Sequence, residues 1–551
     1  MSFEIIDRDL MARIGKLETK SGIVETPLLF PVINPGIQPI SPKTLEVEFG
    51  CRAIITNAYI INKNFKEPAV QKGLHKFLDF NGSIMTDSGA YQLLIYKDIE
   101  VTPKEIVDFQ ELIDTDIATI LDIPTGWDVT KGYARYTVKE TLTRAKALKK
   151  MVLRNDLLWV GPVQGGQYLD LVAKSAKEMG KLPFQIHALG SPTPVMEQYK
   201  FDVLVDMIIM AKMNLPPDRP LHLFGAGHPF MFSLAVALGC DLFDSAAYAL
   251  FARQDRYLTE SGTIRLDEMA YFPCSCPVCN KTDPETVRGL PKKVRQKLLA
   301  EHNLHVSFCE LKRIKQAISE GRLWEHVEMR AHGHPSLLQA LKKLRKYSVN
   351  MEKVSPVTKR SGMFFFSSLG LARPEVIRHI DRLDRYSPPA NAKVLLLLPQ
   401  SRKKPFHTSK EHTTVMNELR LTLGDLVNSV HVCTYAAPFG VVPTEIDEVY
   451  PVSQNEIVLP LDDETLGYVA KQTANYIQQK DYQHVILLRD PSIWKTKIAA
   501  ACRRVCKKKS IPFTATRESD PWSKTTIEKF GKLTHEVVIK IFDFTESRIQ
   551  Y

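Results

Sequence analysis

Eight short segments in the first half of the chain are apolar in their middle and end at turn residues. Such runs are typical of strands that are buried on both faces of a parallel sheet, because neither face can then carry polar side chains. We therefore predict eight strands in this half of the chain. They are Pro27–Ile33, Arg52–Tyr59, Ser83–Ser88, Ile117–Pro124, Leu158–Gly165, Phe184–Gly190, Pro220–Gly227 and Asp241–Tyr248.

Segments with the 3.6-residue periodicity of helices separate most of these strands. They are Pro103–Leu112, Val138–Leu153, Tyr168–Met179 and Pro194–Met213. Strand and helix alternating in this way predict the α/β class and, within it, a (β/α)8 TIM barrel. A doubly wound open sheet is the alternative, but no glycine-rich dinucleotide motif follows the first strand.

Polar residues and glycines gather where the predicted strands end. In a barrel the carboxyl ends of all strands form one mouth, and active sites lie there. These residues are Asn57, Asp87, Ser88, Gly89, Asp122, Gln164, Gly165, Gly166, Gly190, Ser191, Gly225, Gly227, His228 and Asp244. A single aspartate after a strand is often only a turn or helix-cap residue. Three aspartates that converge with several glycine turns indicate a site.

The residue types at this mouth suit the exchange of a glycosidic bond. One carboxylate can attack an anomeric carbon as a nucleophile, and a second can carry the proton to and from the departing group. A third carboxylate, beside an amide and exposed backbone, can recognise the hydrogen-bonding edge of a purine-like base. The pattern therefore predicts a base-exchange enzyme that needs no organic cofactor.

Three of the nine cysteines crowd into one turn, at Cys274, Cys276 and Cys279. This spacing is typical of a structural zinc site, which needs a fourth ligand to complete a tetrahedron. His302 or His305, at the start of a helix that we expect over Ser307–Glu320, can supply that ligand. Nothing in the segment indicates an open coordination position, so we expect one structural Zn²⁺.

Composition adds the size of the protein and the kind of partner. A chain of 551 residues is too long for one hydrophobic core and predicts about two to four domains. The net charge of +11 indicates a polyanionic partner such as nucleic acid, although basic proteins without one are common. No apolar run approaches the roughly 18 residues that span a bilayer, and Met1–Arg13 lacks a signal-peptide pattern. We therefore expect a cytoplasmic protein.

Six short motifs follow one another in the first half. They are Thr86–Gln92, Asp122–Pro124, Val163–Gly166, Phe243–Ala246, Cys274–Cys279 and His302–Leu304. In this order they resemble the tRNA-guanine transglycosylases, and the resemblance covers Phe3 to Gly333. The longer stretch Asp244–Tyr257 resembles the archaeal branch of that family, as do Arg373-Pro-Glu-Val and Gly440-Val-Val-Pro.

The resemblance implies roles for single residues. Asp244 matches the aspartate that forms the family's covalent ribosyl intermediate, and Asp87 matches its proton-transferring partner, although some descriptions of the family reverse the two roles. His302 matches the fourth zinc ligand, in preference to His305. The matches to the base-binding residues are Ser88, Asp122, Gln164, Gly165, Gly190 and Ser191. Ser191 departs from the family's Gly-Gly pair.

The archaeal enzymes insert 7-cyano-7-deazaguanine (preQ0) at position fifteen of the tRNA D-arm, in the biosynthesis of archaeosine. The resemblance therefore implies tRNA, preQ0 and guanine as ligands and a homodimer as the assembly. It implies no association with a membrane. A non-catalytic tRNA-binding subunit built on the same barrel is the alternative. Such subunits lose their aspartates, whereas Asp87, Asp122 and Asp244 are all present here.

The composition changes near Arg330–Gly362, a stretch rich in Lys and Arg that can contact phosphates. Beyond it, Lys393–Pro399 and Tyr482–Leu488 predict buried strands of a small α/β domain that resembles one in archaeosine synthase. We expect domains at 1–335, with a zinc subdomain at about 270–335, then at 336–390 and at 391–551.

The segment Pro399–His412 resembles the signature of the archaeosine synthases, which amidate the inserted base. Gln400 takes the place of their cysteine and Phe406 that of their tyrosine. Without the thiol, the segment implies an inherited scaffold and not a second active site. The tail Phe513–Tyr551 is short and poor in glycine, so we expect no PUA-type RNA-binding domain; a separate protein can supply one.

Overall fold

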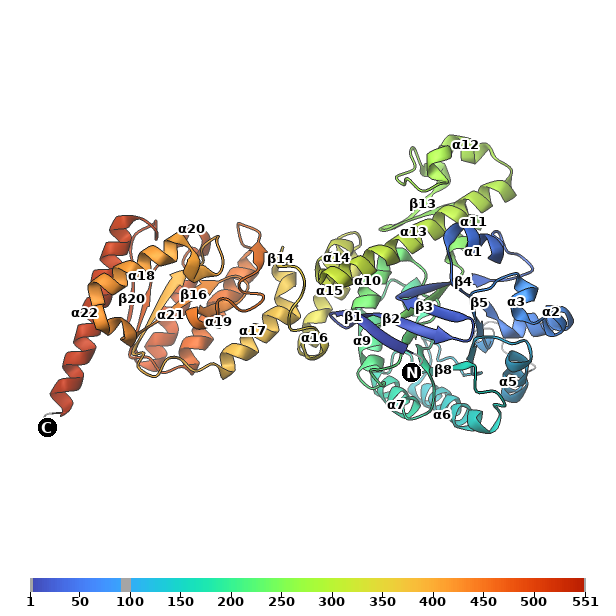
Figure 1. Cartoon of the computed structure of the whole chain (residues 1–551), viewed down its shortest axis with the longest axis horizontal. Helices are drawn as coiled ribbons and strands as arrows, with labels where there is room; N and C mark the ends of the chain where they lie inside the picture. Colours follow the sequence, from blue (N-terminus) through green and yellow to red (C-terminus); the bar gives the residue numbers. More distant parts are fainter. Residues whose placement is uncertain (1–2, 91–100, 550–551) are drawn as a thin grey trace. The chain divides into compact units, whose positions relative to one another are not determined.

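The structure is a computed structural model that describes residues 3–90 and 101–549, with side chains up to residue 543. Two residues of the Thr86–Gln92 motif, Tyr91 and Gln92, lie outside the described residues. The chain forms two compact units, Met1–Leu344 and Arg345–Tyr551 (Figure 1). None of the helices within the described ranges is long and apolar enough to cross a membrane.

The first unit is a closed barrel of eight parallel strands, in the order β10-β11-β4-β5-β6-β7-β8-β9. The predicted (β/α)8 barrel is therefore confirmed, and each predicted strand contains one observed strand. The strands are β4 (Leu28–Ile33), β5 (Ala53–Asn57), β6 (Ser83–Asp87), β7 (Ile117–Thr119), β8 (Leu158–Val163), β9 (Ile186–Leu189), β10 (Leu221–Leu223) and β11 (Leu242–Ser245). Apolar side chains such as Phe30, Met85 and Val160 fill the barrel, so it has a packed core and no pore.

Helices follow the strands around the outside of the barrel. They include α2 (Ala58–Lys72), α5 (Pro103–Leu112), α6 (Lys131–Ala147), α7 (Leu169–Met179), α9 (Phe201–Lys212), α10 (Pro229–Ala237) and α11 (Ala247–Arg253). Helix α6 begins seven residues before the predicted Val138, because the Thr130 side chain caps it by accepting from the Tyr133 N–H. The predicted helix Pro194–Met213 is interrupted at Tyr199, whose φ of +54° is incompatible with a right-handed helix.

An antiparallel sheet of β1 (Phe3–Asp9), β2 (Ala12–Thr19) and β3 (Gly22–Thr26) covers the amino end of the barrel. Its side chains Phe3, Leu17 and Val24 join the barrel core. Arg13 donates to both carboxylate oxygens of Asp241, which directly precedes β11. This sheet does not cover the opposite, carboxyl end of the barrel, where the candidate active site lies.

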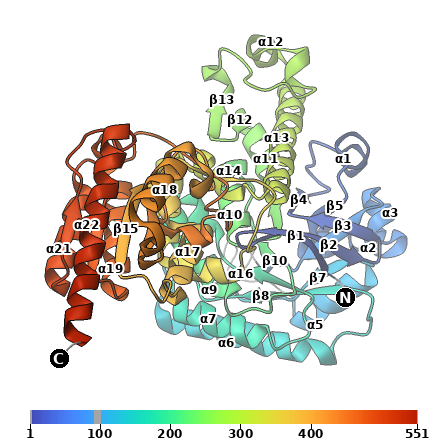
Figure 2. The ribbon, with the colours of Figure 1, turned by 60° about the vertical axis from the view of Figure 1, so that its left-hand side comes forward.

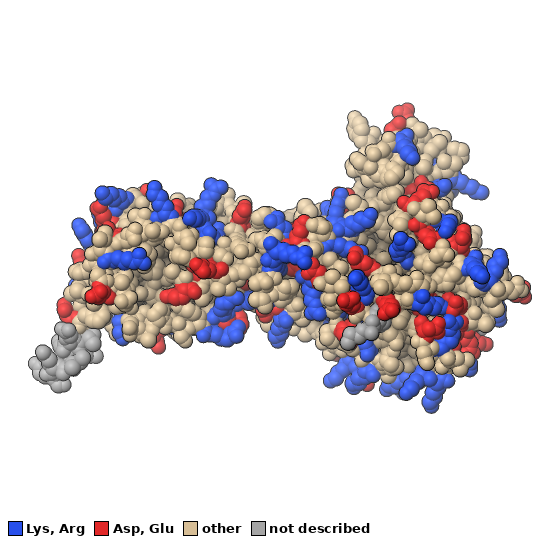
Figure 3. All heavy atoms as spheres, viewed as in Figure 1, with Lys and Arg blue, Asp and Glu red and all other residues tan. Residues whose placement is uncertain are grey.

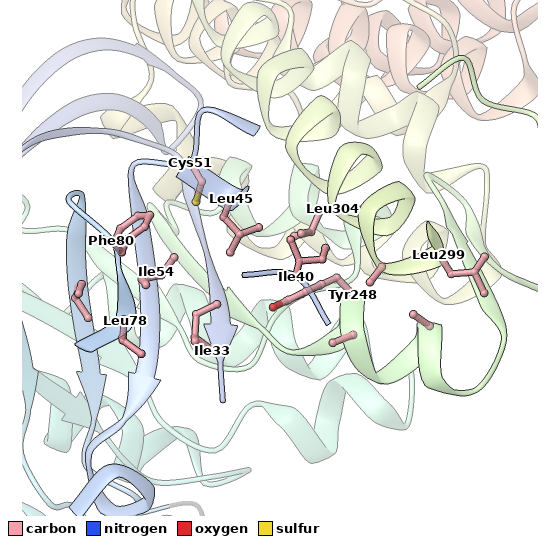
Figure 4. Packing of buried hydrophobic residues seen from close by; sticks show 14 of the residues in the cluster. Ile33, Ile40, Leu45, Cys51, Ile54, Leu78, Phe80, Tyr248, Leu299 and Leu304 are labelled. Carbon is pink, nitrogen blue, oxygen red and sulfur yellow. The ribbon is translucent and has the colours of Figure 1, made fainter. Parts of the chain in front are cut away.

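The segment with the cysteine cluster stands beside the barrel, on helix α13 (Lys292–Glu320) (Figure 2). The prediction that this helix begins at Ser307 is wrong, because its first half packs Leu299 and Leu304 against Tyr248 and neighbouring apolar residues (Figure 4). The other elements of this segment are β12 (Arg256–Thr259), β13 (Gly262–Arg265) and α12 (Pro284–Gly289).

The second unit is an α/β fold, as predicted, around the sheet β17-β16-β15-β19-β20. Its strands are β15 (Val394–Pro399), β16 (Val430–Ala436), β17 (Gly440–Pro443), β19 (His484–Leu487) and β20 (Phe513–Ala515). Helices α17 (Pro374–Arg385), α19 (Asp463–Gln479) and α21 (Lys497–Lys509) pack on one face, and α18 (Lys410–Leu423) and α22 (Lys524–Ile549) on the other. The tail from Phe513 forms β20 and the long helix α22 and not a series of closely spaced strands.

Candidate active site and metal site

Three carboxylates meet at the carboxyl end of the barrel. Asp87 ends β6, Asp122 follows β7, and Asp244 lies in β11. Burial, together with the negative charges of Asp122 and Asp244, raises the pKa of Asp87 to about 7. Burial also raises the pKa of Asp122 to about 6. Asp87 can therefore hold a proton near neutral pH, as a group that transfers protons must.

Asp244 is oriented through one of its two oxygens. Its Oδ1 accepts from the backbone N–H of Gly225 at 2.9 Å and lies 2.9 Å from Nε2 of the buried His222. Its Oδ2 accepts no hydrogen bond from the residues that the structure describes. His222 was not predicted from the sequence, where its only signal is a polar residue in the middle of an apolar strand.

Gln164 links Asp122 to the loop that follows it. Its Nε2 donates to Oδ2 of Asp122 at 2.5 Å, and its Oε1 accepts from the Thr125 N–H at 2.9 Å. Ser191 Oγ donates to the same Oε1 at 3.3 Å. The Gly165 N–H donates to Thr125 Oγ1 at 3.2 Å, so the two loops are joined. Four of the residues assigned to base binding, Asp122, Gln164, Gly165 and Ser191, thus belong to one hydrogen-bonded group.

Two neighbouring positions beside this group, Gly190 and Ser191, have backbone requirements of their own. A Cβ at Gly190 would lie 2.7 Å from Cδ of Gln164, so only glycine lets the amide take its place. Ser191 has a φ of +60°, the left-handed conformation that glycine adopts without strain. The backbone at position 191 therefore has a conformation that suits glycine, although serine occupies it.

Ser88 is fully buried beside Asp87, and its hydroxyl makes no hydrogen bond to a described residue. Asn57 donates from Nδ2 to Oδ2 of Asp87 at 2.9 Å. A buried hydroxyl without a partner is costly unless a ligand completes its hydrogen bonds. Ser88 thus has the chemistry of a ligand contact, and Asn57 that of a residue that orients Asp87.

A second group of residues can hold a metal ion. The ligand atoms of Cys274, Cys276, Cys279 and His302 all lie within 4.8 Å of one another. His302 Nδ1 is 3.5 Å from Cys276 Sγ and 3.3 Å from Cys279 Sγ. His302 Nε2 lies 2.9 Å from the carbonyl oxygen of Leu258, which fixes the tautomer with a free electron pair on Nδ1.

The structure also decides between the two candidate histidines. His305 stacks on Phe49 with ring centroids 4.4 Å apart and is not part of the cluster. His302 is buried and stacks on Tyr257 at 3.5 Å, and Tyr257 stacks in turn on Phe272 next to the cysteine turn. His302 is therefore the fourth member of the group.

Fold and site together define a (β/α)8-barrel protein with a carboxylate-lined mouth and a separate cysteine–histidine group that can hold a metal ion. The chain belongs to the queuine tRNA-ribosyltransferase family, whose profile matches residues 8–336. A second profile, of a domain of unknown function (DUF5591), matches residues 376–536 in the second unit.

Three relatives show how far the similarity extends. The chain is 47% identical over 465 residues to a tRNA-guanine(15) transglycosylase of Methanocaldococcus jannaschii. That alignment covers 83% of this chain and 68% of the relative. It is 42% identical to one from Methanosarcina mazei, in an alignment that covers 88% of this chain and 96% of the relative. It is 44% identical to one from Pyrobaculum aerophilum, in an alignment that covers 83% of this chain and 90% of the relative. All three alignments are longer than the barrel alone.

Proposed function

We propose that the chain exchanges guanine at position 15 of tRNA for 7-cyano-7-deazaguanine, in the biosynthesis of archaeosine. The observation that carries the proposal is the meeting of three carboxylates, Asp87, Asp122 and Asp244, at the mouth of a barrel whose relatives are tRNA-guanine(15) transglycosylases. A carboxyl group whose pKa is raised to about 7 is typical of a catalytic site, which favours an enzyme over a non-catalytic subunit.

Asp244 is the nucleophile in this proposal. Its free Oδ2 attacks C1′ of the ribose, while Gly225 and His222 hold Oδ1. A C–O bond forms, the C1′–N9 bond breaks, and its electron pair leaves with the guanine. The product is a ribosyl ester that keeps the tRNA attached to the enzyme.

Asp87 supplies the proton that the departing base needs. In its protonated form it donates to the guanine as the glycosidic bond breaks, and its carboxylate then accepts the N9 proton of the incoming base. The electron pair left on that base attacks C1′ and displaces the Asp244 carboxylate. Asp87 ends protonated, so the cycle is complete without an added acid or base.

Base recognition falls to the hydrogen-bonded group around Gln164. Asp122 and Gln164 present oxygen and amide atoms to the edge of the base, with Gly165, Gly190 and Ser191 offering backbone at close range. Ser88 contributes its free hydroxyl. The roles match the requirements of a site that must distinguish guanine-like bases by their exocyclic groups.

We further propose that the metal is one structural Zn²⁺, because three thiolates and one imidazole are the ligands of closed tetrahedral zinc sites. Cys274, Cys276, Cys279 and His302 would hold it, and it would tie the cysteine turn to helix α13. We also expect tRNA, guanine and preQ0 as ligands, a homodimer as the assembly, and help in tRNA binding from a PUA-type protein.

The test is incorporation of labelled guanine into a tRNA transcript with guanine at position 15, with unlabelled preQ0 as competitor. Incorporation by the wild type, suppressed by preQ0 and absent from Asp244→Ala and from a transcript with adenine at position 15, would support the proposal. Incorporation that survives in Asp244→Ala would refute the assigned nucleophile. No incorporation, even with a PUA-type protein added, would refute the activity.

A further inference from the structure

Exposed basic side chains lie along the neighbouring helices α6 and α7 and the short turn Leu148–Lys150 after α6. Figure 3 shows Lys and Arg gathered over these helices, along the lower edge of the first unit. We call this group the basic strip; it consists of Arg135, Lys139, Lys146, Lys149, Lys150, Lys174 and Lys177.

The acidic residues of α6 and α7 are too few to neutralise the basic strip. The acidic residues of α6 and α7 pair with other cations: Asp170 with Lys131, Glu140 with Arg144, and Glu178 with Lys181. No member of the strip forms an ion pair with a residue that the structure describes. The positive charge is therefore available to a polyanion outside the chain.

Helix α6 is joined directly to the base-binding group. Thr137 Oγ1 and Thr125 Oγ1 lie 2.7 Å apart, and the Thr125 N–H donates to Gln164. The Ile123 N–H donates to Thr141 Oγ1 at 3.0 Å, one turn further along α6. The second and third turns of the helix therefore lie next to the loop to which we assign base binding.

The first two turns of α6 carry two exposed aromatic rings. Tyr133 and Tyr136 are 47% and 53% exposed, and their ring centroids lie 5.8 Å apart. Lys200 Nζ lies 4.6 Å above the ring of Trp127, in the loop just before α6. Exposing large aromatic rings forfeits the free energy of burying them, so their presence beside a site needs another use.

We infer that the Tyr133–Tyr136 pair and the basic strip bind the single-stranded part of the tRNA next to the exchanged nucleotide. Its bases stack on the tyrosines and its phosphates follow the strip. The inference rests on the proposed function, which requires a base to leave its stack and so leaves its neighbours unstacked. Aromatic rings beside basic side chains are the usual means of holding such bases.

The dimensions agree with this path. A helix with its side chains is about 10–12 Å across, so the tyrosines lie within about that distance of the Thr125 loop. A stacked strand, at about 3.4 Å per nucleotide, spans it with roughly three nucleotides, and an extended single strand needs fewer. Nucleotides on one side of position 15 can thus reach the tyrosines while the target base contacts Gln164.

The experiment measures the Kd for tRNA, by filter binding at several salt concentrations, separately from guanine exchange. The variants are Tyr133→Ala with Tyr136→Ala, and Arg135→Glu with Lys139→Glu. The matched controls are Tyr133→Phe with Tyr136→Phe, which keeps the rings, and Lys72→Glu with Lys76→Glu. Lys72 and Lys76 are exposed and precede β6, at the opposite end of the barrel.

We expect the alanine pair to weaken tRNA binding about tenfold and the phenylalanine pair to leave it unchanged. The Arg135–Lys139 reversal is expected to weaken binding at least tenfold and to lower the slope of log Kd against log salt by about 0.7 per lost contact. Losses no larger than in the Lys72–Lys76 control would overturn the inference. Wild-type protein that binds tRNA in this way but exchanges no guanine would refute only the proposed function.

Discussion

His222 Nε2 lies 2.9 Å from Oδ1 of Asp244, and the two side chains come from the adjacent strands β10 and β11. The carboxylate is thus oriented by the neighbouring strand and by the Gly225 N–H that follows it. His222 is itself buried and stacks on Phe30 with ring centroids 5.8 Å apart. The barrel core therefore determines the direction in which Asp244 presents its free oxygen.

His222→Leu is expected to lower the kcat of guanine exchange about 100-fold, with little change in the KM for tRNA. A carboxylate free to rotate is misplaced by about 1 Å, which typically costs that factor. His222→Gln keeps an N–H donor at a similar place and is expected to recover most of the rate. Equal losses in both variants would show that His222 acts through packing and not through its hydrogen bond.

The kcat of guanine exchange is expected to fall as the pH rises above about 7. The pKa of Asp87 is raised to about 7, so the proton that the departing guanine needs is present below that pH and lost above it. Single-turnover rates between pH 5 and 9 measure this limb. Asp87→Asn is expected to lower the rate at least 100-fold and to abolish the fall in rate above pH 7. If the fall persists in this variant, another group causes it.

The same shift predicts a pH-dependent gain in stability for Asp87→Asn. Between about pH 4 and 7 the folded protein keeps a proton that the unfolded chain releases, so the buried carboxyl costs stability as the pH rises through this window. The amide has no such cost. We expect Tm to rise by about 2 °C at pH 8 and not at pH 4, with Asp128→Asn, at an exposed position, as the unaffected control.

The barrel was predictable because its strands are buried on both faces and are therefore short, mainly apolar segments between turn residues. Position in a strand also predicted which residues share the mouth, since the carboxyl ends of parallel strands lie on one side. The contact between His222 and Asp244 was not predictable, because it depends on the register of β10 against β11. A histidine in an apolar strand is otherwise an ordinary core residue.

The N-terminal sheet and the start of helix α13 were missed for a different reason. Strand β1 alternates buried and exposed residues over only seven positions, and such a short pattern is weak. The first half of α13 carries many charged residues, and few apolar ones such as Leu299 and Leu304 show which side is buried. Their partner Tyr248 lies far away in the sequence, so only the tertiary structure reveals the contact.

Loss of the proposed zinc ion is expected to lower the stability of the first unit. Cys276→Ser removes one ligand of the group that ties the cysteine turn to α13, and we expect less than one zinc per chain and a Tm lower by about 5 °C. His305→Ala is the control, because His305 stacks on Phe49 outside the group. Metal content by mass spectrometry and calorimetry measure both; an unchanged zinc content in Cys276→Ser would contradict the assignment.

Gly190→Ala is expected to abolish guanine exchange without unfolding the protein. The new Cβ would lie 2.7 Å from Cδ of Gln164 and would push the amide away from Asp122, which it contacts at 2.5 Å. Ser191→Gly is the matched substitution at the next position. It removes one hydrogen bond of 3.3 Å but suits the φ of +60°, so we expect activity within about threefold of the wild type. Binding of preQ0, measured by calorimetry, is expected to follow the same order. Normal preQ0 binding by Gly190→Ala would show that the base lies elsewhere in the mouth and would remove Gln164 from its recognition.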